Sequence, residues 1–354
     1  MFARLAPEQY DSIPGVPEPR ENPLLFGHRE AADLLASAYR GGRLHHALLL
    51  SGPHGIGKAT FAFHLAHHLL RYPRAEEAPE TLSLPDPATP LFRQTAGGSH
   101  PALLHLARPY NEKTKTFRGA LTVDEIRRVN RFLSLTAHDG SHRIVVVDSA
   151  DDMNTNAANA LLKNLEEPPQ RTLFILIAHS AGALLPTIRS RCQTVRMRPL
   201  EKEALLKVLS TLETDLPADP KARDALAEKA AGSARAAILL TQFGGFEIME
   251  ALEGAVNAAK PDIAGTYRLA DAVSGKDQAI QFSLFNNGVL EFVEGRAGKA
   301  AENGDVSSAG RFGTLWQELR RQMAETDAFN LDRRQHVVSV IGRVREIVHS
   351  GGMG

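Results

Sequence analysis

The chain has a single cysteine, Cys192, among its 354 residues. One thiol cannot form a disulfide within one chain, and it cannot supply a zinc site made of four thiolates. Long apolar runs are also missing, because no stretch approaches the roughly 20 residues that a membrane-spanning helix needs. The sequence therefore excludes a disulfide framework and predicts a chain without a membrane span.

Two further absences bear on location and on partners. Residues 1–23 contain no apolar core followed by a small-residue cleavage site, so no secretory signal is visible and we expect a cytoplasmic protein. Neither sign of charge is in excess, since Lys plus Arg number 41 and Asp plus Glu also number 41. A protein that binds nucleic acid on its own usually has a basic excess. Partners would therefore supply most of the positive charge for any DNA contact.

Strand and helix patterns alternate from about residue 24 to residue 199. Apolar runs predict strands at 44–50, 102–107, 143–148 and 172–178. Helical periodicity predicts helices at 28–39 and 58–71, and further helices that begin at 122 and at 154 or 155. Near-continuous apolar runs that alternate with helices indicate a parallel sheet covered on both faces, so the expected fold class is α/β.

Two segments lack sustained periodicity. Residues 1–23 are rich in proline, which predicts an arm that lies on the surface or is partly disordered. Residues 72–98 are crowded with Pro, Glu, Ala and Gly. We expect this second segment to be an inserted surface loop.

Beyond Pro199 only helical patterns remain. Short amphipathic segments at 201–212, 219–231 and 233–243 predict a small helical lid, and longer ones near 246–257, 261–273, 277–294, 308–325 and 330–348 predict an all-helical domain. The expected division is an arm at 1–23, an α/β core at 24–199, a lid at 200–244 and a helical domain at 245–354.

The motif GPHGIGK, from Gly52 to Lys58, lies between an expected strand and an expected helix. In that setting it is typical of a phosphate-binding loop. Gly52, Gly55 and Gly57 let backbone N–H groups face phosphate oxygens, the helix N-terminus adds a positive dipole, and Lys58 neutralises the outer phosphates. The alternative is a glycine turn followed by an unrelated lysine.

The loop departs from its pattern at one position. A Ser or Thr should follow the lysine and place its hydroxyl on Mg²⁺, but Ala59 stands there. Asp148 ends an apolar strand, as a magnesium-binding acid should, although it could instead cap the following turn. The sequence therefore predicts a nucleotide site whose support for Mg²⁺ is incomplete.

Residues 25–245 resemble the bacterial clamp-loader AAA+ subunits. The specific marks are ANALLKNLEEPP at 158–169 and the triplet Ser190-Arg191-Cys192, and two shorter matches are SHP at 99–101 and VDEIR at 123–127. The resemblance implies an AAA+ P-loop parallel sheet core with a small helical lid and an all-helical C-terminal collar. It also implies ATP and Mg²⁺ as cofactors, bound weakly or without hydrolysis.

Within that family, gamma/tau subunits hydrolyse ATP and delta prime subunits usually do not. The resemblance places a catalytic Glu after Asp148, where this chain has Ser149, and a first sensor at Ala178. These changes favour the delta prime type, without ATPase activity of its own. Arg235, in the run GSAR, resembles the second sensor and could reach a nucleotide, or it could be a solvated helix arginine.

Membership would make the chain a subunit of the DNA polymerase III holoenzyme. Its partners would be gamma/tau and delta, the sliding clamp, and primed DNA through the complex, with no membrane contact. Arg191 would act as an arginine finger on a neighbour's phosphate. Alternatively, Arg191 pairs with a carboxylate of its own domain. Two rival functions are a hydrolysing gamma/tau-type subunit and a regulatory P-loop switch.

Metal binding by other residues is not expected. The family's four-cysteine zinc module has no counterpart in residues 72–98, so we expect no zinc. His64 and His68 stand four residues apart on one helix face, but no HExxH pattern accompanies them. A surface or packing role is favoured for both.

Overall fold

The structure, a computed structural model, describes residues 4–134, 142–180, 182, 184–212, 214, 216–329 and 331–350. Residues 1–3 of the expected arm, residue 330 of the last expected helix and residues 351–354 of the expected collar lie outside this description. The chain forms two compact units, Met1–Glu213 with Pro217–Ala236, and Thr214–Leu216 with Ala237–Gly354. Most of the expected lid thus groups with the first unit. The division into arm, core, lid and collar stays a prediction.

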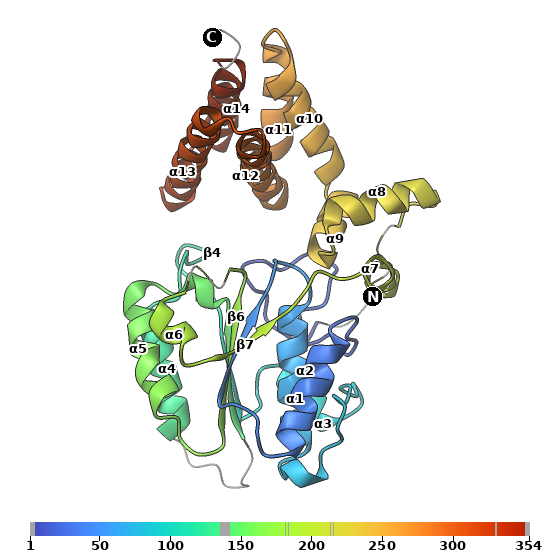
Figure 1. Cartoon of the computed structure of the whole chain (residues 1–354), viewed down its shortest axis with the longest axis vertical. Helices are drawn as coiled ribbons and strands as arrows, with labels where there is room; N and C mark the ends of the chain where they lie inside the picture. Colours follow the sequence, from blue (N-terminus) through green and yellow to red (C-terminus); the bar gives the residue numbers. More distant parts are fainter. Residues whose placement is uncertain are drawn as a thin grey trace. The chain divides into compact units, whose positions relative to one another are not determined.

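A five-stranded sheet forms the centre of the first unit (Figure 1). Its order is β2 (Leu103–Leu106), β5 (Arg143–Asp148), β6 (Thr172–Ala178), β1 (Ala47–Ser51) and β7 (Gln193–Arg196). Each neighbouring pair is parallel. All seven residues of β6 are buried, as expected for a strand in the middle of a covered sheet. The prediction of a parallel α/β core is confirmed.

Helices cover both faces of this sheet (Figure 1). One face carries α1 (Arg29–Arg40), α2 (Lys58–Arg71) and α3 (Pro90–Ala96), and the other carries α4 (Val123–Ser134), α5 (Thr155–Glu166) and α6 (Pro186–Arg189). Alternate residues of β1 serve the two cores, because Leu48 and Leu50 face α2 while Ala47 and Leu49 face the opposite layer.

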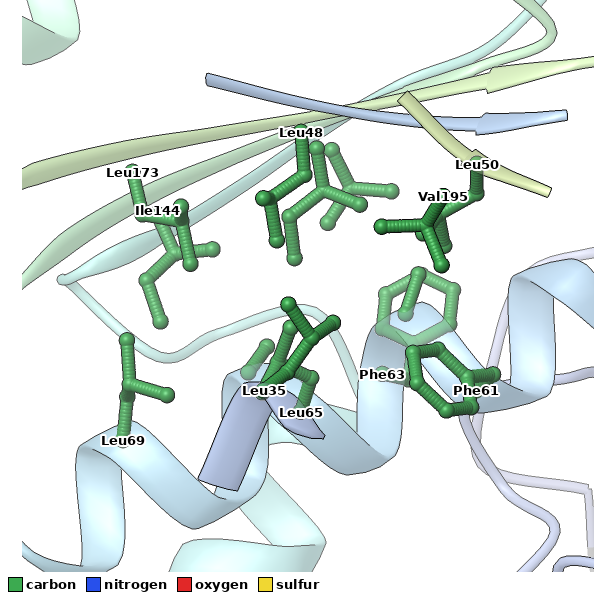
Figure 2. Packing of buried hydrophobic residues seen from close by; sticks show 14 of the residues in the cluster. Leu35, Leu48, Leu50, Phe61, Phe63, Leu65, Leu69, Ile144, Leu173 and Val195 are labelled. Atoms are coloured by element: carbon green, nitrogen blue, oxygen red, sulfur yellow. The ribbon is translucent and has the colours of Figure 1, made fainter. Parts of the chain in front are cut away.

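Figure 2 shows the core on the α2 side of the sheet. Leu35 of α1 and Phe61, Leu65 and Leu69 of α2 lie opposite Leu48 and Leu50 of β1, Ile144 of β5, Leu173 of β6 and Val195 of β7. Burying one such side chain contributes roughly 1.5–3 kcal/mol. This packing fixes the start of α2, and therefore the phosphate loop, against the end of β1.

Three regions of the first unit differ from the sequence expectations. Within 72–98 the chain forms a short 3-10 helix at Ala75–Glu77 and the helix α3, so a loop without regular structure is wrong for this segment. Thr89 caps α3 by accepting a hydrogen bond from Phe92 N–H at 3.2 Å, and Phe92 is buried. The edge strand β7 and the hairpin of β3 (Tyr110–Asn111) and β4 (Thr116–Phe117) were not predicted.

The described part of the arm, residues 4–23, has no helix or strand, yet it is folded against the first unit. Ala6 and Ile13 are buried. The buried Glu21 accepts hydrogen bonds from the N–H groups of Leu5, Ala6 and Glu18. One carboxylate therefore holds the arm in a defined bend.

Helices make up the remaining chain. In the first unit α7 (Lys202–Thr211) and α8 (Pro220–Ala230) contact each other. Helix α9 (Ala234–Gln242) begins in this unit, and its residues from Ala237 onward belong to the second unit. The second unit holds α10 (Gly245–Asn257), α11 (Ile263–Val273), α12 (Ala279–Glu302), α13 (Val306–Ala328) and α14 (Arg333–Ser350) around one apolar core. The helical C-terminal region is therefore confirmed. Among the residues that the structure describes, no helix is both long enough and apolar enough to cross a membrane.

Candidate nucleotide site

The phosphate loop joins β1 to α2, as the sequence predicts. Gly55 has φ +76° and Gly57, the residue before α2, has φ +98°, so both need the left-handed freedom of glycine. Gly52 is required by packing, because a Cβ there would lie 2.3 Å from the carbonyl oxygen of Met197. The structure thus brings together the three glycines expected to shape a phosphate cradle.

Lys58 is almost fully buried, with 3% of its surface exposed. Its Nζ donates hydrogen bonds to Gly52 O at 2.6 Å and to Pro53 O at 2.5 Å, both within the loop. Burial lowers the pKa of Lys58 to about 8, although Asp148 and Asp151 favour the charged form. The ammonium group is therefore at the expected place, directed at the loop's own carbonyl groups.

Acidic residues gather at the end of β5. Burial raises the pKa of Asp148 to about 7, the carboxylate of Asp11 adds to this shift, and Lys58 opposes it. Asp148 is therefore ionised less readily than an ordinary aspartate, which weakens it as a ligand for Mg²⁺. Asp151 accepts a hydrogen bond from the N–H of His179.

The three positions that depart from an ATP-hydrolysing site lie beside the loop. Ala59 packs against the apolar core and has no oxygen to offer Mg²⁺. Ser149 is fully buried, and its hydroxyl has no partner among the described residues. Ala178 contributes only its backbone oxygen, which accepts from Gly52 N–H at 3.3 Å. The site fits a phosphate group, but its side chains fit a tightly held Mg²⁺ poorly.

Arg235 reaches the loop from the first turn of α9. Its backbone N–H donates to Gly55 O at 3.4 Å, and a Cβ on Gly55 would lie 2.5 Å from the Arg235 Cβ. Its guanidinium donates to the backbone oxygen of Asp11 in the arm. The structure therefore places Arg235 at the phosphate loop, in contact with a residue that sequence reasoning did not select.

The arm adds further residues to the site that the sequence did not reveal. The carboxylate of Asp11 lies 3.3 Å from Nε2 of His54, inside the GPHGIGK motif. The guanidinium carbon of Arg108 lies 4.2 Å from the centre of the Tyr10 ring. Nε of the same arginine donates a hydrogen bond to Asp152 Oδ2 at 2.7 Å. No local pattern predicts these contacts.

Arg191 follows α6, two residues after its end, and its side chain is 34% exposed. Its Nη2 lies 2.5 Å from the carboxylate of Glu166, and its Nη1 donates to Thr187 O at 2.8 Å. The pairing with a carboxylate of the same domain, which the sequence left open as an alternative, is thus present in the single chain.

His64 and His68 are both buried on α2. His64 is hydrogen-bonded through Nε2 to Asn22 O at 2.9 Å, and His68 through Nδ1 to Ser83 Oγ at 2.9 Å. Each histidine therefore joins α2 to a neighbouring segment, which is a packing role. Among the described residues, no group of three or more His, Cys, Asp or Glu side chains is arranged to hold a metal ion.

The chain is similar in sequence to several known proteins. A family profile described as "DNA polymerase III, delta subunit" matches residues 27–201. The "DNA polymerase III subunit delta'" of Pseudomonas aeruginosa is 41% identical over 155 residues, which is 43% of this chain and 43% of that protein. The protein of the same name from Escherichia coli is 29% identical over 321 residues, 89% of each chain.

The match to the Pseudomonas relative therefore spans less than half of that protein's length. Among solved structures, a DNA polymerase III gamma subunit-related protein of Thermotoga maritima has a TM-score of 0.45 and 17% identity, covering 90% of this chain and 98% of that one. By sequence, the chain is thus similar to delta' subunits of bacterial DNA polymerase III, over residues 27–201 for the family profile and over 89% of its length for the Escherichia coli protein.

Proposed function

We propose that this chain is a delta prime-type subunit of a DNA polymerase III clamp loader. It would assist the ATP-driven loading of the sliding clamp onto primed DNA without hydrolysing ATP itself. The observation that carries the proposal is a phosphate loop that keeps its glycines and Lys58 while the hydrolysis positions hold Ala59, Ser149 and Ala178, in a chain that matches the Escherichia coli delta' subunit over 89% of its length.

Gamma/tau and delta subunits are the partners that this function requires. The chain has no net charge, so contact with primed DNA would be made through the assembled complex. ATP, if bound, would contact Gly52, Gly55, Gly57 and Lys58 in the loop and Arg235 beside it. Asp148 is the acid best placed for Mg²⁺, and its raised pKa favours a weak interaction.

Arg191 would act on catalysis in a neighbouring subunit, by contacting the phosphate of the nucleotide bound there. A guanidinium is charged at any physiological pH and presents a planar fork that suits a phosphate. The Glu166–Arg191 pair is partly exposed on both sides, and exposed ion pairs contribute only about 0–1 kcal/mol. A neighbour's triphosphate could therefore take the place of Glu166 at little cost.

Co-purification tests this function. The full chain is co-expressed with gamma/tau and delta subunits, and the complex is isolated through a tag on delta. We expect the chain to enter the complex and to be required for clamp loading on primed DNA. Recovery of gamma/tau and delta without this chain would refute the proposal, and recovery with unrelated proteins alone would favour the regulatory P-loop switch.

A further inference from the structure

The N-terminal arm lies across the phosphate loop. The Asp11 carboxylate is 3.3 Å from Nε2 of His54 and 3.9 Å from Nη1 of Arg235, while the Asp11 backbone oxygen accepts from the same guanidinium. One residue of the arm therefore engages both the loop and the arginine expected to sense a nucleotide's phosphate.

The negative charge of Asp11 is favoured by its neighbours His54 and Arg235. Burial would raise its pKa, but the hydrogen bond from His54 and the charge of Arg235 keep the pKa below its usual value. The carboxylate is thus ionised at neutral pH. It supplies an internal anion where two cationic or hydrogen-bonding side chains converge.

Lys58 and Tyr10 also have partners within the chain. Nζ of Lys58 donates hydrogen bonds to the carbonyl oxygens of Gly52 and Pro53. Tyr10, next to Asp11, is anchored under Arg108, which is itself held by Asp152. The loop's lysine, the expected sensor and the arm are therefore all satisfied within one chain.

We propose that the arm is the resident ligand of this phosphate loop: Asp11 stands where a phosphate of a nucleoside triphosphate would bind. The site takes a nucleoside triphosphate only when residues 4–23 move away, so arm and nucleotide compete. This inference rests on the proposed nucleotide site, and it adds the condition under which that site is open.

Binding of a fluorescent ATP analogue with Mg²⁺ to the full chain tests the competition. Asp11→Asn keeps the shape of the side chain and removes its charge, and we expect about tenfold tighter binding than in the unchanged chain. Glu8→Gln is the matched control, because Glu8 lies in the same arm and pairs with Arg4. It should leave the affinity unchanged. Lys58→Ala added to Asp11→Asn should remove the gain.

Hydrogen exchange on the unchanged chain gives a second measurement that does not depend on a variant. Saturating ATP should raise amide exchange across residues 4–23, because the arm leaves the loop. Tight ATP binding with the arm still protected would overturn the proposal. So would a folded Asp11→Asn chain with unchanged affinity, or the absence of ATP binding in both chains. Entry into the complex with delta and gamma/tau is measured separately, so failure of the two proposals can be told apart.

Discussion

Glu166 and Arg191 form an ion pair between the last residue of α5 and the segment after α6, with 2.5 Å between Oε1 and Nη2. Both side chains are partly exposed, so water competes for each of them. The same guanidinium can therefore be paired in the free chain and be available to a phosphate in an assembly.

This relationship leads to a prediction on the loader. Arg191→Ala should change the free energy of unfolding of the isolated chain by no more than about 1 kcal/mol. In the reconstituted complex it should sharply slow hydrolysis at one partner site, since an arginine finger contributes roughly 10³ to 10⁵ in rate. Arg191→Lys should not restore the rate, because an ammonium lacks the planar fork.

Glu166→Gln is the matched control, because it removes the ion pair and keeps the guanidinium. The loader's clamp-stimulated ATPase should survive this change. If the Glu166→Gln chain loses as much ATPase as the Arg191→Ala chain, or if Arg191→Ala costs several kcal/mol of stability, then Arg191 has a structural role only.

A second prediction concerns the isolated chain, which should release phosphate from ATP at a negligible rate. Loss of a general base alone costs typically 10² to 10⁴ in rate, and Ser149 has no carboxylate to replace it. Ala59 and Ala178 remove two further groups. Phosphate release by the purified chain is the measurement, and turnover that Lys58→Ala abolishes would contradict the prediction.

The third prediction is on stability at acid pH. His67 on α2 is 3% exposed and has no hydrogen-bond partner for either ring nitrogen among the described residues. Burial lowers its pKa to about 4, and neighbouring cationic groups add to the shift. The unfolded chain therefore takes up a proton near pH 6.5 that the folded chain resists. Stability falls as pH drops from about 6.5 to 4, by about 3 kcal/mol for this residue.

His67→Leu has a similar volume and no titrating group. Chemical denaturation at pH 7 and at pH 4.5 should show a smaller loss of stability in this variant than in the unchanged chain. Comparing the two chains also cancels Asp148, whose raised pKa acts in the opposite direction. Equal losses in both chains would show that His67 is not buried in its neutral form.

A fourth prediction concerns the second unit, which we expect to supply most of the intersubunit contact. A chain that ends at Phe243 keeps the parallel sheet and both of its helical layers, so it should fold. It should nevertheless fail to enter the complex with gamma/tau and delta. Circular dichroism checks the folding, and co-purification checks the assembly. Normal affinity of the shortened chain would refute a collar role for residues 245–354.

The sequence predicted the elements that have a continuous apolar pattern. Strands β5 and β6 and helix α2 lie at their predicted bounds, since their buried residues form unbroken runs or a wide helix face. The edge strand β7 buries only Val195 of its four residues, too few for a pattern. Helix α3 spans seven residues, less than the window over which a helical period can be recognised.

Some residues of the candidate site could be predicted from a local pattern in the sequence, and others could not. Gly52 to Lys58 and Asp148 could be selected because a loop or strand end is a local feature of the chain. Asp11 could not, because its partners His54 and Arg235 are 43 and 224 positions away. Contacts between such distant residues depend on how the arm folds over the sheet, and no spacing in the sequence records that.

Gly52 and Gly55 have a consequence for variation at this loop. A methyl group on Gly52 would collide with the Met197 backbone, and one on Gly55 would meet Ser233 and Arg235 at 2.4 and 2.5 Å. Both glycines are thus needed to make room for the backbone that follows β7 and for the start of α9, whatever the loop binds. A lineage that stopped using nucleotide would still have to keep them, so the glycine pattern by itself does not measure nucleotide use.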